Sequence, residues 1–166
     1  MTADLFLTNV AFYVFGAIAL IGALIAVAQQ NILRAALGLI VSFLGVAGIY
    51  FVLEAEFIGI VQILVYVGAI AILILFSVML TRGLMQSAAS AHNSQWIGAA
   101  FVALLLFAVL GFIALGTKWN VAAQKITGDL IPKIGTELMT TYLLPFEAVS
   151  LLLLAALVGA IVIARE

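Results

Sequence analysis

Long uninterrupted apolar runs are the feature of this sequence that most restricts its fold. Five such runs, each of about 20 residues, are separated by polar stretches, and a helix of that length crosses a hydrocarbon core of about 30 Å. Hydrophobic residues make up 67% of the 166 residues and charged residues only 8%. Soluble domains average about 45–50% apolar and about 25% charged residues, so the chain is predicted to be an integral membrane protein.

The apolar runs also indicate which kind of membrane fold to expect. They lack the alternation of barrel strands, and in lipid the remaining solution is a helix that pairs its own backbone groups. We therefore predict an all-α polytopic membrane protein, a bundle of five transmembrane helices within one integral membrane domain, 1–166. The expected spans are 6–28, 32–53, 57–80, 96–116 and 142–164. The stretch "TKWNVAAQKITGDLIPKIGTELMTTY" before the last span is expected to be a long loop.

The charges flanking the spans suggest an orientation. An odd number of spans places the two termini on opposite sides, and short connections rich in Lys and Arg usually face the cytoplasm. One side carries Arg34, Arg82 and Arg165. The other carries Asp4, Glu54 and Glu56, together with the long-loop lysines Lys118, Lys125 and Lys133. The Lys and Arg counts tie, and the short connections decide, because they are basic on one side and acidic on the other. We expect the arginine side in the cytoplasm, matrix or stroma, and the N-terminus outside.

Small residues recur at helical spacing in two of the predicted spans. In 32–53 they are Ala35, Gly38, Ser42 and Gly45, and in 142–164 they are Ala148, Ala155, Ala156, Gly159 and Ala160. Membrane helices associate through such flat surfaces, within one chain or between chains. The stripes leave open which partner each helix has, and lipid or foreign helices must cover the remaining apolar surface.

Residue types that carry chemistry are scarce. The sequence has no cysteine, which excludes disulfides and cysteine ligation of zinc or iron–sulfur clusters in this chain. The net charge of -1 argues against nucleic-acid binding, and the single histidine, His92, lies in a polar loop. We therefore predict no catalytic residue, no cofactor-binding residue and no metal site in this chain.

One carboxylate enters a predicted span. Glu147 lies about one turn inside 142–164, whereas the other acids fall in loops or at the termini. Intramembrane acids are often parts of proton paths, so Glu147 is a possible outer-face acid, although an N-terminal acid that complements the helix dipole is the favoured interpretation. With this single acid the chain lacks the relay that an independent pump would need.

The third span, 57–80, contains a sparse set of polar residues. Gln62 and Tyr66 are four residues apart and share a face, and Ser77 falls about three turns after Tyr66 on roughly the same face. Gly68 lowers helix propensity by about 1 kcal/mol relative to alanine. Interhelical hydrogen bonding is the interpretation that the residues alone favour. The alternative is a weak point that hosts a π-bulge and lines a water path.

Three stretches of the sequence are distinctive: "NILRAALGLIVSFLGVAGIYFVLEAEF", "AEFIGIVQILVYVGAIAILILFSVML" and "LLPFEAVSLLLLAALVGAIVIARE". They resemble the second, third and last helices of subunit J of the proton-pumping NADH:quinone oxidoreductase, respiratory complex I, a family with mitochondrial and chloroplast counterparts. "QILVYVGAI" is the most specific part. One departure is Ala71, where many members carry a larger residue.

The resemblance implies a non-redox subunit of the membrane arm that helps couple quinone reduction to proton translocation. It implies a π-bulge at Tyr66, Val67, Gly68 and Ala69 that gates a water path to carboxylates of neighbouring subunits. The implied partners are lipid and the K, A and H type subunits. The chain itself would hold no cofactor, whereas the whole complex would use NADH, FMN, iron–sulfur clusters and quinone.

The implied location is the bacterial cytoplasmic membrane, or the mitochondrial inner or thylakoid membrane. A homologous subunit of a multisubunit cation/proton antiporter, a membrane-bound hydrogenase or a photosynthetic NDH-type complex is the alternative. A small independent carrier or channel is disfavoured, because the predicted spans carry almost no charge.

Overall fold

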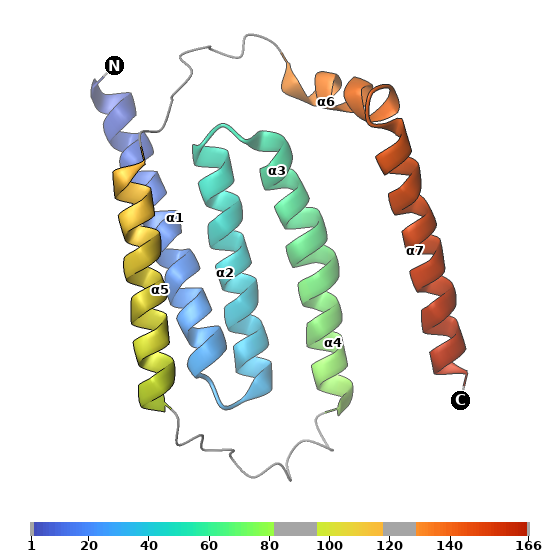
Figure 1. Ribbon diagram of the computed structural model, residues 1–166, viewed down its shortest axis with the longest axis horizontal. Coiled ribbons are helices and arrows are strands. Elements are labelled where there is room, and N and C mark those ends of the chain that lie inside the picture. The colour runs from blue at the N-terminus through green and yellow to red at the C-terminus, as the bar shows by residue number, and fades with distance from the viewer. Residues whose placement is uncertain (1, 82–95, 118–128, 166) are drawn as a thin grey trace. The chain divides into compact units, whose positions relative to one another are not determined.

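The computed structural model describes residues 2–81, 96–117 and 129–165, and every regular element within these ranges is a helix (Figure 1). Five helices are long and apolar enough to cross a membrane: Leu5–Ala28, Ile32–Val52, Glu56–Thr81, Ile97–Gly116 and Leu143–Ala164. They agree with the predicted spans to within a few residues, which confirms the all-α prediction with five candidate spans. The chain divides into two compact units, Met1–Val121 and Ala122–Glu166, which are described in turn.

The first unit begins with a helical hairpin of α1 (Thr2–Ala28) and α2 (Ile32–Val52). A short turn joins the two helices, and its last residue, Asn31, caps α2. The Asn31 Oδ1 atom accepts hydrogen bonds from the backbone N–H groups of Leu33, at 3.0 Å, and Arg34, at 3.3 Å. This cap satisfies two of the N–H groups that a helix start leaves unpaired, so α2 begins sharply after the turn.

Glycines bring the backbones of α1 and α2 into direct contact. A Cβ atom on Gly45 would lie 2.5 Å from the Ala19 nitrogen, and one on Gly38 would lie 2.8 Å from the Ala26 nitrogen. Gly38 and Gly45 are both buried. They belong to the small-residue stripe predicted in the second span, and the structure shows that the partner of these two glycines is α1 of the same chain.

The third span is built from three consecutive segments, α3 (Glu56–Val61), η1 (Gln62–Ala71) and α4 (Ile72–Thr81), and all three contact α2. A tight link connects α2 to α3. Its Glu54 has a φ of 58°, a left-handed conformation, and the Ala55 N–H donates to the Tyr50 carbonyl at 2.9 Å. This turn reverses the chain, so the third span runs antiparallel to α2 (Figure 1).

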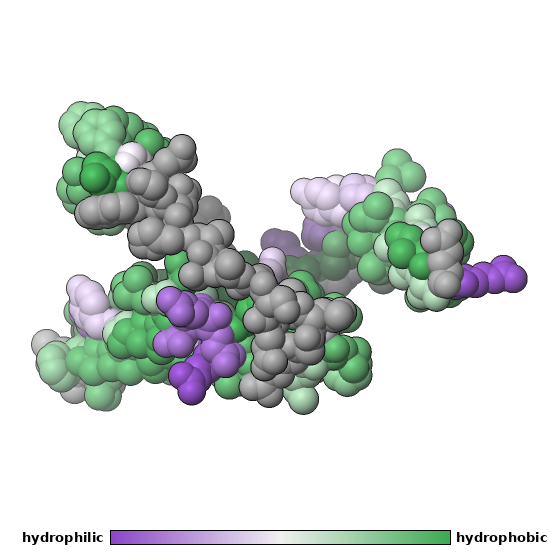
Figure 2. All heavy atoms as spheres, turned by 90° about the horizontal axis from the view of Figure 1, so that it is seen from below, coloured by the Kyte–Doolittle hydropathy of each residue, from purple (hydrophilic) through white to green (hydrophobic). Residues whose placement is uncertain are grey.

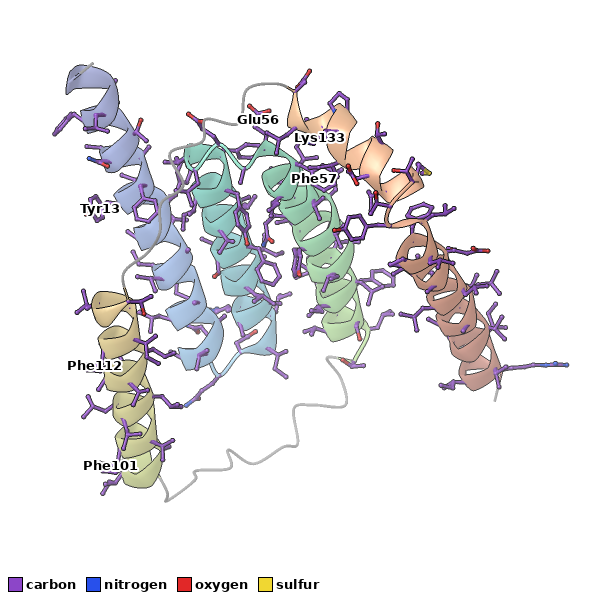
Figure 3. All side chains as sticks on the ribbon, turned by 45° about the horizontal axis from the view of Figure 1, so that its top comes forward. Tyr13, Glu56, Phe57, Phe101, Phe112 and Lys133 are labelled. Carbon is purple, nitrogen blue, oxygen red and sulfur yellow. The ribbon has the colours of Figure 1, made fainter. Side chains whose placement is uncertain are left out.

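Two further spans are covered by little of their own chain. Helix α5 (Trp96–Gly116) has no buried residue in its most apolar window, and Phe101 and Phe112 point outward from it (Figure 3). Helix α7 (Leu143–Ala164), in the second unit, likewise has no buried residue in its most apolar window. Apolar residues therefore form most of the visible surface of the described helices (Figure 2), as expected for helices surrounded by lipid or by other subunits.

The prediction of a long loop before the last span is wrong in part, because this stretch contains the helix α6 (Leu130–Met139). Leu130, Ile134 and Leu138 recur every four residues, which places them on one helical face. The helix was overlooked in the sequence because it is too short and too polar to be a span. Helix α6 contacts α7 and lies across its N-terminal end (Figure 1).

Candidate functional site

The third span departs from regular α-helical geometry over the ten residues of η1, which form a π-helix. The residues on either side are ordinary, with φ/ψ of -60°/-40° at Val61 and -66°/-40° at Ile72. A π-helix pairs each residue with the one five positions away, so its turns are wider than α-helical turns. The four residues of the implied bulge, Tyr66, Val67, Gly68 and Ala69, all lie within this stretch.

Gly68 occupies a crowded position in the π-helical backbone. A Cβ atom at Gly68 would lie 3.3 Å from the carbonyl oxygen of Ile63, five residues earlier. That contact is tighter than most Cβ contacts, so a side chain here requires the Ile63 carbonyl to move. Glycine avoids this shift, and it also weakens the competing α-helical form.

Gln62, the first residue of η1, is the buried polar side chain of the described residues. It is 6% exposed, and its side-chain amide makes no hydrogen bond to any of them. Every fully enclosed side-chain nitrogen or oxygen in the described part of the chain has a partner, so the Gln62 amide must keep a small accessible surface. A nearly buried amide without a protein partner is the kind of group that an ordered water satisfies.

Tyr66 contacts the neighbouring helix through its ring. The rings of Tyr66 and Phe43, on α2, meet edge to face with centroids 5.6 Å apart and planes at 76°. Phe43 was overlooked in the sequence. It directly follows Ser42 of the small-residue stripe, which signals a position near a helix interface, but no pattern along the chain pairs it with Tyr66.

Ser77, which was predicted to share a face with Gln62 and Tyr66, has different surroundings. Ser77, in α4, is exposed whereas Gln62 is buried, so the structure does not bring the two into one environment. The widened turns of η1 alter the helical register after Tyr66, and eleven residues then no longer complete three regular turns. The Ser77 carbonyl accepts a hydrogen bond from the Thr81 hydroxyl at 2.9 Å.

Glu147 is the fifth residue of α7 and is exposed. The first turn of α7 contains no acid, so Glu147 lies deeper than an N-terminal dipole-complementing acid normally does. Its backbone carbonyl accepts a hydrogen bond from the Ser150 hydroxyl at 2.7 Å. Pro145 is the third residue of α7, where its missing N–H requires no intrahelical partner.

Within residues 2–81, 96–117 and 129–165, no cluster of three or more His, Cys, Asp or Glu side chains is arranged to hold a metal ion. His92, Arg82 and the carboxyl-terminal Glu166 lie outside the described residues, and the sidedness predicted from the arginines stays a prediction. The feature with functional potential is thus the π-helical segment with its nearly buried amide and its aromatic contact to α2.

Comparison with known proteins places this segment in a family. Residues 22–163 match the model of "NADH-ubiquinone/plastoquinone oxidoreductase chain 6". The chain belongs to this family. The matched region contains α2, the whole third span, α5 and all but the end of α7, so the family assignment covers both compact units and the π-helix.

Several chain 6 relatives are similar along most of their length. F(420)H(2) dehydrogenase subunit J of Methanosarcina mazei is 40% identical over 159 residues, covering 92% of this chain and 89% of the relative. NAD(P)H-quinone oxidoreductase chain 6 of Leptolyngbya boryana is 38% identical, covering 95% and 79%. The chloroplastic subunit 6 of Adiantum capillus-veneris is 37% identical, covering 89% and 79%. The resemblance seen in the sequence is therefore confirmed, and with it membership of a membrane-embedded oxidoreductase complex.

Proposed function

We propose that this chain is the chain 6, or J, subunit in the membrane arm of a proton-pumping quinone oxidoreductase of the complex I type. It has no redox role and helps couple quinone reduction to proton translocation. The observation that carries the proposal is the π-helix Gln62–Ala71 inside the candidate span Glu56–Thr81. Such turns are rare and are frequent at functional sites, and the family match supports the setting.

In this proposal η1 is a conformational gate. In the π form, the Gln62 amide lacks a protein partner and binds water, which opens a polar path beside the helix. Conversion to a regular α-helix rotates the residues after the inserted turn, moves Tyr66 relative to Phe43 and closes the path. Gly68 keeps the two forms close in free energy, because it lowers α-helix propensity by about 1 kcal/mol relative to alanine.

A gate of this kind needs acids from other chains. Among the described residues, Glu147 is the one carboxylate that lies within a span beyond its first turn. We place the proton-carrying carboxylates on a K-type neighbour, with A and H type subunits also adjacent, and FMN, iron–sulfur clusters and quinone elsewhere in the complex. Glu147 faces a neighbouring subunit at the outer side, while Arg34 and Arg165 face the cytoplasm, or the matrix or stroma of an organelle.

A second candidate keeps the gate and changes the electron donor. The Methanosarcina mazei relative is a subunit of an F(420)H(2) dehydrogenase and the Leptolyngbya boryana relative of an NAD(P)H-quinone oxidoreductase. The same membrane subunit is thus compatible with complexes fed by NAD(P)H or by F(420)H(2). Assaying purified complex with each donor decides between them.

The experiment that tests the gate is Gly68→Leu in the intact complex, reconstituted in vesicles. A leucine side chain obstructs the Ile63 carbonyl position of the π form, so the protons moved per electron should fall several-fold. Electron transfer from the donor to an artificial acceptor bypasses the membrane arm and should be unchanged. Tyr66→Phe should lower the same ratio less, because it removes one hydroxyl and keeps the ring.

Gly111→Leu provides the matched control. Gly111 lies in α5, and nothing lies within 4 Å of a Cβ atom placed there. Its substitution should leave both assays unchanged. Full proton pumping in the Gly68→Leu complex would overturn the gating proposal, whereas migration of the wild-type chain as a monomer outside any large complex would overturn the subunit assignment.

A further inference from the structure

We propose that α6 is an interfacial helix that lies along the membrane surface, with its apolar face among the acyl chains and its polar face in water. The helix is unlike the spans, because its polar and apolar residues are separated onto two sides. At 100° per residue, the aliphatic residues Leu130, Ile131, Ile134 and Leu138 occupy one arc, Lys133 and Thr136 lie outside it on a polar arc, and Glu137 stands at the border beside Leu130.

The connection to α7 supports the membrane as the occupant of that apolar face. Only Thr140, Thr141 and Tyr142 separate α6 from α7. The Tyr142 N–H donates to the Glu137 carbonyl at 2.8 Å, and the Phe146 N–H donates to the Tyr142 carbonyl at 3.0 Å. Helix α6 is therefore tied directly to the end of a candidate span, and it lies across that end (Figure 1). A helix that is tied to the end of a span and lies across it is at the level expected for the membrane surface.

The junction itself has the composition of a membrane interface. Tyr142 is 55% exposed, and tyrosine is enriched where apolar chains meet headgroups. The Thr136 hydroxyl donates to the Pro132 carbonyl at 3.0 Å, and the Thr140 hydroxyl donates to the Thr136 carbonyl at 2.8 Å. These bonds satisfy polar groups within the chain, which lowers the free energy needed to bring this segment close to lipid.

The charges on α6 indicate which bilayers it suits. Lys133, on the polar arc (Figure 3), is accompanied by Glu137 and by Asp129 at the helix start. One positive and two negative side chains give this segment no basic surface to attract anionic headgroups. Contact with the bilayer therefore depends on the aliphatic arc, and it should be the same in neutral and in anionic phospholipid.

The absence of cysteine from the sequence makes a direct test possible. Ile131→Cys and Lys133→Cys place single thiols on opposite arcs of α6, two residues apart, and Thr136→Cys adds a second polar position. Each variant is spin-labelled in vesicles that contain the assembled complex, and the signal from an unsubstituted complex is subtracted. Collision with oxygen, which concentrates in lipid, is compared with collision with a water-soluble nickel chelate.

The expected result is a several-fold higher ratio of oxygen to nickel collisions at Ile131 than at Lys133 and Thr136. The ratio should not change between phosphatidylcholine vesicles and vesicles that also contain phosphatidylglycerol. Equal, high nickel access at all three positions would place α6 in water and overturn the proposal. Protection of Ile131 from both reagents would show that another protein surface covers the aliphatic arc and would overturn it equally.

Discussion

Helix α2 packs against two neighbours in two different ways. On its α1 side Gly38 and Gly45 meet backbone atoms of Ala26 and Ala19, and Gly48 also meets the Phe15 ring. On the side of the third span the contact is between rings or between a ring and a glycine, as in the Phe43–Tyr66 pair and the Phe51 ring, which lies 3.1 Å from a Cβ position on Gly59.

The difference indicates which interface is fixed and which one can move. In lipid, helices gain little by hiding apolar surface, so close packing largely determines how tightly they associate. Backbone contact through glycine leaves no room for a shift, whereas a ring at the end of a side chain can follow a rotating helix by changing its χ angles. The α1–α2 hairpin is thus suited to be a rigid support, and η1 to be the segment that changes form beside it.

The largest expected effect comes from breaking the rigid side. Gly45→Leu would place a side chain where Ala19 backbone atoms lie within 2.5–2.7 Å, which should destabilise the hairpin by about 3 kcal/mol, the upper end for overpacking. The measurement is the amount of assembled complex in membranes together with its Tm. Gly16→Leu, in α1 with nothing within 4 Å of its Cβ position, is the control. Equal loss in both variants would remove the distinction between the two interfaces.

On the other side of α2, substitution should affect function and not stability. Gln62→Leu replaces a nearly buried amide that has no partner among the described residues, and because its removal breaks no hydrogen bond within the chain, the Tm should stay unchanged. The protons moved per electron should nevertheless fall several-fold, because the water site is lost. Gln30→Leu, in the exposed α1–α2 turn, should change neither quantity.

If Gln62→Leu left the number of protons moved per electron unchanged, the Gln62 amide would not be part of a water path beside the π-helix. A fall in both Tm and pumping would instead mean that Gln62 is a packing residue, as the interhelical hydrogen-bond interpretation of the sequence requires.

The number and type of the spans were predictable from the sequence, because length and hydropathy alone decide them. The α1-facing glycines were also visible, since Gly38 and Gly45 follow helical spacing. What the sequence did not contain is the partner, because a flat stripe fits any helix. The structure supplied Ala19 and Ala26, which look unremarkable along the chain.

The candidate site was predictable only where a residue type is unusual for its setting. Gln62, Tyr66 and Gly68 stand out in an apolar span, and they lie within η1. The extent of the π-helix and the contact with Phe43 depend on tertiary geometry, which spacing along one helix does not encode. Ser77 was placed on the face of Tyr66 by assuming a constant rotation of about 100° per residue. The π-helix has a different rotation per residue, so that assumption fails.

A smaller effect is expected at the turn that joins the rigid pair. Asn31→Ala removes the acceptor for the N–H groups of Leu33 and Arg34 and should destabilise the chain by about 1 kcal/mol, the usual value of such a cap. Asn31→Asp keeps the acceptor and should retain stability. The measurement is the Tm of the complex, and pumping should be unchanged in both variants, because the glycine contacts between α1 and α2 remain. A change in pumping would mean that the hairpin does more than support η1.

The most local effect is expected at the ring contact. Phe43→Leu removes the edge-to-face pair with Tyr66, which is worth about 0.5–1.5 kcal/mol beyond area burial. The leucine still fills part of the space of the phenylalanine ring with an apolar side chain. Its effect should be local: faster backbone hydrogen exchange over Gln62–Ala71, with exchange over α1 unchanged. Phe12→Leu is the control, because Phe12 meets Tyr13 edge to face at 5.8 Å within α1, away from η1. If hydrogen exchange in η1 stayed at the wild-type rate in Phe43→Leu, the ring contact would not stabilise the π form. Any change of form in η1 would then depend on the backbone of the third span alone.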